Sequence, residues 1–314
     1  MLHNCDDIEI IDAHIHLPSS HSLFPSFYEP IGDNIYSAIR KYFPRMSKEA
    51  AINNIKSVYS DHNAEKLILD MNEANIKKAI LLLPDLTYAL KGVHYSIEDQ
   101  IEQHINVIKT NPGRFYLMAG VDPRWGKSGF ELFKKYVDQK VINGLKLYTP
   151  CGYFPNDPKL RPYYELCSDI KMPVIFHTGP TSPVFRFEYS RIQHIDEIAH
   201  KYPNINIILA HGGVNNIDEA VELCAYRPNV YLDISGYMMT KDPLGPLKAL
   251  KNLFKRKVNH KIIFGTDWPI GGYKSKYHGI VKSLLKPEND VITQLSKSEV
   301  RMIFNENILE LLYQ

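Results

Sequence analysis

The feature that most constrains the fold is a repeated alternation between short apolar runs and longer segments with a helical pattern. The runs are rich in Ile, Leu and Val, and such short, continuous hydrophobicity is typical of parallel strands buried on both faces. Eight strands alternating with helices predict a closed (β/α)8 barrel of the TIM type. The alternative is an open doubly wound sheet, but no Gly-rich phosphate-binding loop follows the first run. The eight runs are Ile8–Ala13, Ala79–Leu83, Phe115–Gly120, Ile142–Tyr148, Pro173–Phe176, Ile205–Ala210, Val230–Asp233 and Lys261–Gly265.

Two of the intervening segments show clear helical patterns. Residues Ala64–Asn75 place Leu67, Ile68, Met71 and Ala74 on one stripe, as a helix facing a core requires. The last segment opens with Ser296 and has Glu299 three residues later, which is the pattern of a capping box. Its apolar face consists of Val300, Ile303, Phe304, Ile308, Leu311 and Leu312.

Length and charge exclude several classes of protein. The chain has 314 residues, and one barrel of this type needs about 250, so we expect a single domain over residues 1–314. The net charge is +2 and no dense basic run occurs, which argues against a nucleic-acid partner. The longest wholly apolar run, Ala79–Leu83, is far shorter than the roughly 20 residues of a membrane span.

The remaining composition indicates the cellular setting. The N-terminal segment MLHNCDDIEI has no basic start followed by an apolar stretch, so it does not resemble a signal peptide. The cysteines are scattered without a C-x-x-C pair, and we expect reduced thiols in a cytoplasmic protein. The expected partner is a small-molecule substrate, and the sequence permits a homodimer. The four cysteines are Cys5, Cys151, Cys167 and Cys224.

An insertion separates the first two predicted strands, which lie about 60 residues apart in the chain. Most of residues 17–62 must form this insertion, and because it follows a strand it rises from the rim where barrel active sites are built. Its aromatic content favours a cap over a small-molecule pocket, whereas the alternative is a surface excursion that packs on itself. The aromatic residues are Phe24, Phe27, Tyr28, Tyr36, Tyr42 and Phe43.

Potential metal-binding side chains recur at the ends of the predicted strands. His14 and His16 are two positions apart on the first strand, so both project to the same face. His177, His211 and Asp267 end the fifth, sixth and eighth strands. Singly, each histidine could bond a loop carbonyl, and the aspartate could cap a turn. Together they converge on one rim, and His and Asp without Cys suit Zn²⁺, Mn²⁺, Fe²⁺ or Co²⁺.

With these residues in place, the chain resembles the amidohydrolase superfamily, specifically its aminocarboxymuconate-semialdehyde decarboxylase-like group. The resemblance implies a (β/α)8 barrel with one divalent metal, for which Zn²⁺ is the first expectation. It also implies that His14, His16, His177 and Asp267 are the ligands, and that His211 contacts the substrate or a metal-bound water. The motifs that carry it occur in the order IDAHIHLP, GVDPR, GLKLYTP, YYELCSDIKMPVIFHTG, IILAHGG, VYLDISG and FGTDWPI.

Lys146, in GLKLYTP, is open to two interpretations. On its strand it shares a face with Tyr148, which predicts that it points into the barrel. Its position resembles the lysine that some superfamily members carboxylate to bridge two metals. The other interpretation, which we prefer, is an uncarboxylated lysine that pairs with Asp12 or Asp267 or contacts the substrate, because a buried ammonium needs a partner or a lowered pKa.

Three further residues are candidates for substrate binding. Arg124 follows the third strand and could clamp a substrate carboxylate, or it could form an ion pair that stabilises its loop. Tyr148 and Trp268 adjoin the metal-binding residues in sequence and could line the pocket, although aromatic side chains there could equally be packing.

The resemblance implies an enzyme, and three functions fit it. The first is a metal-dependent hydrolase of a small carboxylate-bearing amide, ester or lactone, in which metal-activated water attacks, Asp267 transfers the proton and His211 stabilises the oxyanion. The second is a metal-dependent non-oxidative decarboxylase of an aromatic or muconate-type acid. The third is a barrel that binds without catalysis. The preference for the hydrolase rests on Lys146.

Overall fold

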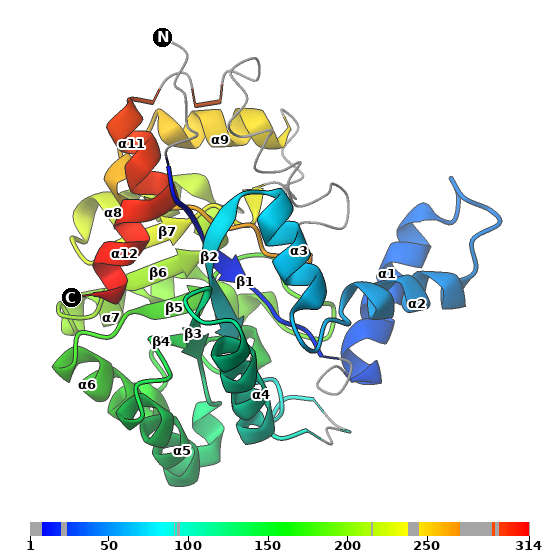
Figure 1. The fold of residues 1–314 in the computed structure, drawn as a ribbon, viewed down its shortest axis with the longest axis horizontal. Helices are drawn as coiled ribbons and strands as arrows, with labels where there is room; N and C mark the ends of the chain where they lie inside the picture. The colour runs from blue at the N-terminus through cyan, green and yellow to red at the C-terminus, as the bar shows by residue number, and fades with distance from the viewer. Residues whose placement is uncertain are drawn as a thin grey trace.

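The protein is described by a computed structural model that covers residues 8–19, 24–90, 92, 95–214, 216–237, 245–270, 291–292 and 295–313. Eight parallel strands form one sheet in the order of the chain, β1 to β8, with helices around it (Figure 1). The strands are β1 Ile10–Ile15, β2 Ile76–Leu83, β3 Phe115–Ala119, β4 Gly144–Leu147, β5 Val174–His177, β6 Ile207–Ala210, β7 Val230–Asp233 and β8 Ile262–Ile263.

Hydrogen bonds between β1 and the segment after β8 close the sheet on itself. The amide of Ala13 donates to the carbonyl of Phe264 at 3.0 Å. The amide of Asp267 donates to the carbonyl of His14 at 2.9 Å, and His16 donates to Trp268 at 2.8 Å. This closure confirms the predicted barrel, and it forms a seam in which four of the predicted site residues, His14, His16, Asp267 and Trp268, take part through their backbones.

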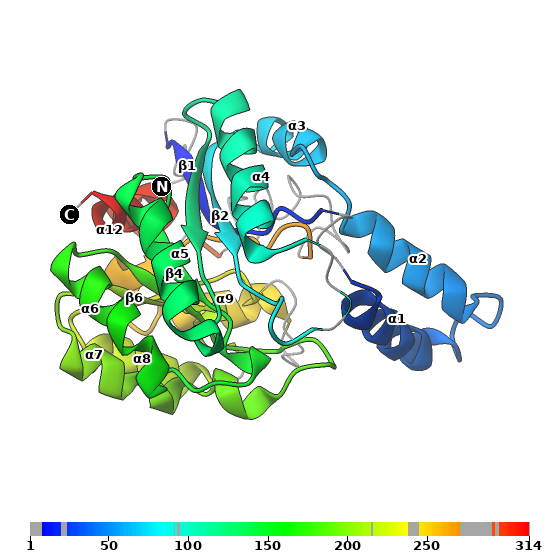
Figure 2. The same ribbon diagram turned by 90° about the horizontal axis from the view of Figure 1, so that it is seen from below.

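The helices that follow the strands lie around the outside of the barrel (Figures 1 and 2). The predicted capping box at Ser296 and Glu299 is present and begins α11. The helices after β2 are α4 Ile97–Thr110, α5 Gly126–Asp138, α6 Arg161–Asp169, α7 Asp196–Lys201, α8 Ile217–Tyr226, α9 Pro246–Phe254, α11 Lys297–Arg301 and α12 Asn307–Leu312, the last two joined by a π-helical turn over Met302–Glu306.

The core has two parts, one on each side of the strands. The outer part fills the space between strands and helices. The inner part fills the barrel with side chains such as Ile80, Ile175 and Ile208, and Ile308 and Leu311 of α12 pack into it. The π-helical turn helps to dock this helix, because the carbonyl of Ile303 accepts a hydrogen bond from the amide of Phe264 at 2.8 Å.

The insertion after β1 consists of α1 Pro25–Ile39, α2 Lys48–Val58 and α3 Glu65–Glu73. Helices α1 and α2 project away from the barrel as a helical hairpin (Figures 1 and 2). Tyr28, Ile55 and Tyr59 form a small core within this hairpin. Helix α3 is the predicted helix of residues 64–75, and its Leu67 and Met71 are fully buried.

The sequence also predicts reduced cysteines and no membrane-spanning segment. Cys151, Cys167 and Cys224 are buried free thiols, whereas Cys5 lies outside the described residues. Within the described ranges, the helices are too short or too polar to cross a bilayer.

Candidate metal centre

The histidines of β1 are held by hydrogen bonds that fix their orientation. His16 Nδ1 lies 2.9 Å from the carbonyl oxygen of Leu82, and because a carbonyl only accepts, Nδ1 carries the proton. His14 Nδ1 lies 2.8 Å from Oδ2 of Asp233. Both rings therefore present Nε2 as a lone pair, which is the arrangement of metal-binding histidines whose other nitrogen donates to a carbonyl or carboxylate.

The two Nε2 atoms meet Asp267, which follows β8 across the seam. Oδ1 of Asp267 lies 3.5 Å from Nε2 of His14 and 3.4 Å from Nε2 of His16. These distances are too long for hydrogen bonds, and both Asp267 Oδ1 and His14 Nε2 are buried atoms with no partner in the described chain. Two ligands that bind Zn²⁺ tetrahedrally lie about 3.3–3.4 Å apart. The three side chains therefore fit one divalent ion.

Burial tunes the charges of this cluster. Desolvation, then the nearby Lys146, lowers the pKa of His14 well below its ordinary value and that of His16 to about 3. Desolvation raises the pKa of Asp267 well above its ordinary range, although Lys146 opposes the rise. Neutral imidazoles keep their lone pairs at neutral pH, so the histidines are ready to bind a cation.

Lys146 is an almost completely buried cation in the same region. Desolvation lowers its pKa to about 8, whereas the charges of Asp233 and Asp267 act in the opposite direction. Its Nζ makes no hydrogen bond within the described residues. Asp12, its other expected partner, instead accepts hydrogen bonds from Thr266 and from the amide of His14. The lysine therefore acts on the cluster through its charge, and its carboxylation state stays a prediction.

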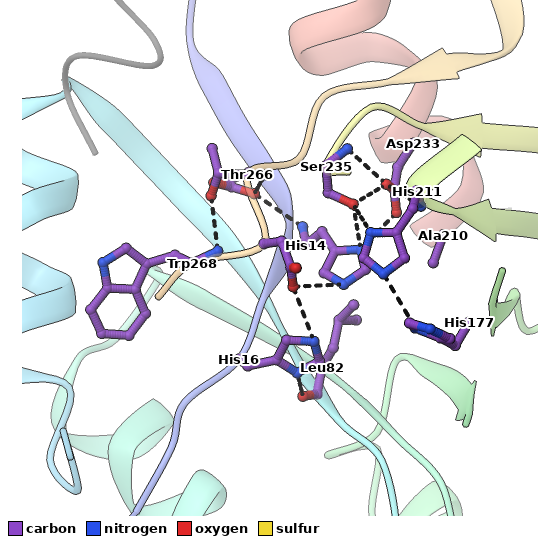
Figure 3. Close-up of polar contacts among 12 residues, drawn as sticks. His14, His16, Leu82, His177, Ala210, His211, Asp233, Ser235, Thr266 and Trp268 are labelled. Carbon is purple, nitrogen blue, oxygen red and sulfur yellow. Dashed lines mark hydrogen bonds and ion pairs between the residues drawn. The ribbon is translucent and has the colours of Figure 1, made fainter. Parts of the chain in front are cut away.

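His177 and His211 lie beside the three-residue cluster rather than within it. His177 Nε2 donates to the carbonyl of Pro180 at 3.1 Å, and its Nδ1 lies 3.2 Å from Nε2 of His211. His211 Nδ1 in turn lies 2.9 Å from the hydroxyl of Ser235, which donates to Asp233 (Figure 3). The structure thus places the predicted ligand His177 in contact with His211, and not next to Asp267.

The backbone at this site adopts conformations that cost energy. His211 and Asp267 have φ angles of +63° and +59°, in the left-handed region that residues other than glycine rarely occupy. Such strain amounts to about 1–3 kcal/mol per residue and clusters at functional sites. Gly265 permits the close approach of β1, because a Cβ there would lie 2.7 Å from Cβ of His14.

Sequence reasoning missed two residues that hold this site together. We assigned no role to Asp233 or Ser235, yet Asp233 binds His14 and Ser235 contacts both His14 and His211. The strand-end position that identified His177 and His211 also applies to Asp233, which ends β7. That signal was therefore present in the sequence.

A cavity of about 630 Å³ opens onto the cluster. His16, His177, His211 and Asp267 lie in its wall, and the insertion contributes Phe24, Phe27, Ile31, Asn34 and Tyr59. Tyr59 was not among our sequence candidates. The insertion therefore covers part of the cavity, although two of its aromatic residues, Tyr42 and Phe43, are 79% and 58% exposed and lie away from it.

The three sequence candidates for substrate binding differ in their positions. Tyr148 lines the cavity, and its hydroxyl lies 2.8 Å from Oγ1 of Thr181. Arg124 lies outside the cavity lining, where its guanidinium binds both carboxylate oxygens of Asp122, at 2.8 and 2.6 Å, and stacks on Tyr88. This is the loop-stabilising ion pair that was its alternative interpretation.

Trp268 is also outside the described lining. Its indole Nε1 donates to Asp70 of α3 at 2.9 Å, and its side chain is buried. The residue anchors the segment after β8 to the insertion, so its role in this structure is packing rather than substrate contact.

Asp233→Asn should weaken metal binding by roughly 10- to 100-fold, because residues that orient a metal-binding histidine contribute that much. The amide would remove the charge that Nδ1 of His14 faces while preserving the side-chain shape. Competition with a chromogenic chelator measures the dissociation constant. Asp138→Asn, which changes an exposed carboxylate paired with Lys134 on α5, is the control. Equal affinities in parent and Asp233→Asn would contradict the assignment.

Comparisons with known proteins identify the family and agree with the fold. The Amidohydrolase family model matches residues 11–313. A 5-carboxyvanillate decarboxylase from Novosphingobium aromaticivorans, complexed with manganese and 4-hydroxy-3-methoxy-5-nitrobenzoic acid, is 15% identical, with 98% of this chain and 97% of that chain covered and a TM-score of 0.69. A probable 2-pyrone-4,6-dicarboxylic acid hydrolase from Acinetobacter baumannii, with citric acid bound, is 15% identical over 97% and 99%, with a TM-score of 0.63.

A third solved structure, 2,6-dihydroxybenzoate decarboxylase with 2,6-dihydroxybenzoate, is 14% identical over 96% of this chain and 100% of that chain, with a TM-score of 0.60. At these identities the solved structures show the shared fold. No curated protein matches the chain significantly. Because the family model spans almost the whole sequence, the chain belongs to the Amidohydrolase family.

Proposed function

We propose that the protein is a metal-dependent, non-oxidative decarboxylase of a small aromatic acid. The observation that carries the proposal is the cavity, whose largely apolar wall opens directly onto His16 and Asp267. Phe24 and Phe27 offer aromatic surfaces and Leu86 offers an aliphatic one, and such an apolar lining suits an aromatic ring. Two of the three solved structures described above are named as decarboxylases and hold substituted benzoic acids, which supports the same interpretation.

The position of Arg124 bears on how a substrate carboxylate would be bound, whichever reaction follows. Its guanidinium, the expected clamp for that carboxylate, is already bound to Asp122. In the described part of the cavity wall there is no Arg or Lys. We therefore assign the substrate carboxylate to the ion site, where His14, His16 and Asp267 would hold a divalent ion whose charge would neutralise that of the carboxylate. Zn²⁺ is the expected ion, and the manganese in the related decarboxylase makes Mn²⁺ the alternative.

The reaction requires one proton at the ring carbon that carries the carboxylate. In the proposal Asp267 delivers it, because its carboxyl lines the cavity and burial raises the pKa of that carboxyl well above its ordinary range, which favours the protonated form. Protonation of that carbon lets the bond to the carboxylate break, its electron pair return to the ring, and CO2 leave. Asp267 is then reprotonated from solvent. The apolar wall excludes water from the reacting carbon.

A hydrolase remains the second candidate because of one observation, the unpartnered and buried Lys146. A carboxylated lysine there would favour a two-metal hydrolytic site. The structurally similar protein that is named a probable 2-pyrone-4,6-dicarboxylic acid hydrolase supports hydrolysis as the second candidate reaction.

A paired screen on metal-loaded protein tests the proposal. We expect CO2 release from at least one hydroxybenzoate, loss of that release after treatment with a chelator, and recovery with Mn²⁺ or Zn²⁺. In D2O the product should carry one deuterium at the carbon that lost the carboxylate. Lactones and N-acyl amino acids are followed in parallel by proton release. Metal-dependent hydrolysis without CO2 release from any acid would overturn the decarboxylase in favour of the hydrolase.

A further inference from the structure

A histidine outside the metal cluster also lies in the cavity wall. Gln100 and His104 are one turn apart on α4, so they share a face, and both line the cavity beside Leu82 and Leu83. His104 is buried, with only 2% of its surface exposed. His16, a member of the candidate ion site, lines the same cavity, and His104 is close enough to contribute to lowering the pKa of His16.

The hydrogen bond that His104 makes determines what it can offer a ligand. Its Nδ1 lies 2.7 Å from the backbone carbonyl oxygen of Gln100. Because a carbonyl only accepts, the ring proton is on Nδ1, and Nε2 is a lone-pair acceptor. Burial, reinforced by the charge of His62, lowers the pKa of His104 to about 4, so the ring is neutral at physiological pH.

This acceptor is left without a partner. Nε2 of His104 is buried and makes no hydrogen bond within the part of the chain that the structure describes. Native proteins pair the great majority of their buried polar atoms, and a ring that served only packing would be better replaced by Phe or Leu. A buried acceptor in the wall of a cavity can instead be satisfied by a hydrogen-bond donor on the ligand.

We propose that His104 is a specificity residue whose Nε2 accepts a hydrogen bond from a hydroxyl group on the substrate ring. The inference rests on the proposed decarboxylase and narrows its substrate to a hydroxylated aromatic acid. Both acids named with the similar decarboxylases carry a ring hydroxyl, which is consistent with such a substrate.

The contact would also assist the chemistry. When Nε2 accepts the hydrogen bond, the O–H bond is polarised and the oxygen donates more electron density to the ring. Positions ortho and para to the hydroxyl then accept a proton more readily. If the carboxylate is at such a position, the incoming proton adds to that carbon, the C–C bond breaks and CO2 leaves, while the hydroxyl proton stays on its oxygen.

Binding to matched ligand pairs tests this role without requiring turnover. Calorimetry on the metal-loaded protein compares each monohydroxybenzoate with its methyl ether, which has no proton to donate. We expect one hydroxyl isomer to bind at least about tenfold more tightly than its ether. In His104→Phe that ratio should fall to about one, with the affinity for the ether and the metal content nearly unchanged. His104→Gln, which keeps an acceptor oxygen, should retain part of the preference.

Controls separate this role from a merely structural one. Leu86→Ala enlarges the same cavity without removing an acceptor, so it should change both members of a pair by similar factors. If His104→Phe does not fold, His104→Leu replaces it as the apolar variant. An unchanged preference in the apolar variant, or no preference in the parent at any ring position, would overturn the assignment.

The two proposals can fail separately. If hydroxyl preference depends on His104 but none of the acids loses CO2, the decarboxylase is wrong and the role of His104 stands. If CO2 is released and the apolar variant keeps the full preference, the decarboxylase stands and the inference about His104 is wrong.

Discussion

Asp267→Asn is expected to lower the rate of CO2 release by roughly 10²–10⁴-fold, the usual contribution of a positioned acid or base. An amide keeps an oxygen where Oδ1 approaches His14 and His16, but it cannot deliver a proton to the ring carbon. The measurement is kcat at saturating Mn²⁺ or Zn²⁺, with the bound metal determined by elemental analysis of the same samples. Loss of rate with metal retained would separate proton transfer from metal binding.

A neighbouring aspartate provides the control for this substitution. Asp70 accepts a hydrogen bond from Trp268, the residue that follows Asp267, and it lies outside the described cavity lining. Asp70→Asn keeps an acceptor oxygen, so its kcat should stay within about threefold of the parent. More than about a tenth of parental activity in Asp267→Asn would show that another group supplies the proton.

His14→Ala is expected to abolish stable metal binding. His14 belongs to both groups of potential ligands that the described residues form, one with His16 and Asp267 and the other with His211 and Asp233. The substitution removes the buried Nε2 ligand and leaves Asp233 without its imidazole partner. After gel filtration, metal per chain should fall from about one to below about one tenth, and activity should fall with it.

Two further variants make the metal analysis interpretable. His260→Ala removes an exposed histidine before β8, and its metal content should equal that of the parent. His177→Ala tests a ligand that the resemblance implies although the structure turns its ring toward His211 and Pro180. We expect metal loss in this variant as well. Equal metal content in His177→Ala and the parent would remove His177 from the ligand set.

The barrel was predictable because its signal is the hydrophobic pattern itself. Each of the eight apolar runs overlaps an observed strand, since strands buried on both faces need continuous apolar side chains. Finer detail of β1 was not predictable. Its pairing with β2 shifts register between Asp12 and Ile15, so Ile11 and Ala13 pack inside the barrel while Ile15 packs outside. The alternation of inward and outward side chains along a regular strand does not predict where such a register shift occurs.

The candidate site was predictable only to the level of the strand ends. Parallel strands bring their carboxyl ends together, which is why His14, His16 and Asp267 meet. The choice of partner for a long or rotatable side chain depends on the surrounding structure. Arg124 finds Asp122 only two residues away, and the ring of His177 turns to His211. Tyr59 and His104 reach the cavity from α-helical regions, and no strand-end pattern could identify them.

The seam between β1 and the segment after β8 joins parts of the chain that are far apart, since Asp12 and Thr266 are separated by 254 positions. Contacts of such high sequence separation carry the largest loop-closure cost and form late in folding. A divalent ion held by His14 and His16 of β1 and by Asp267 after β8 would cross-link the two sides of this seam. The free energy of ion binding would then contribute to the free energy that keeps the barrel closed. In a barrel that is not closed, the three ligands would be apart, so the ion would have no binding site.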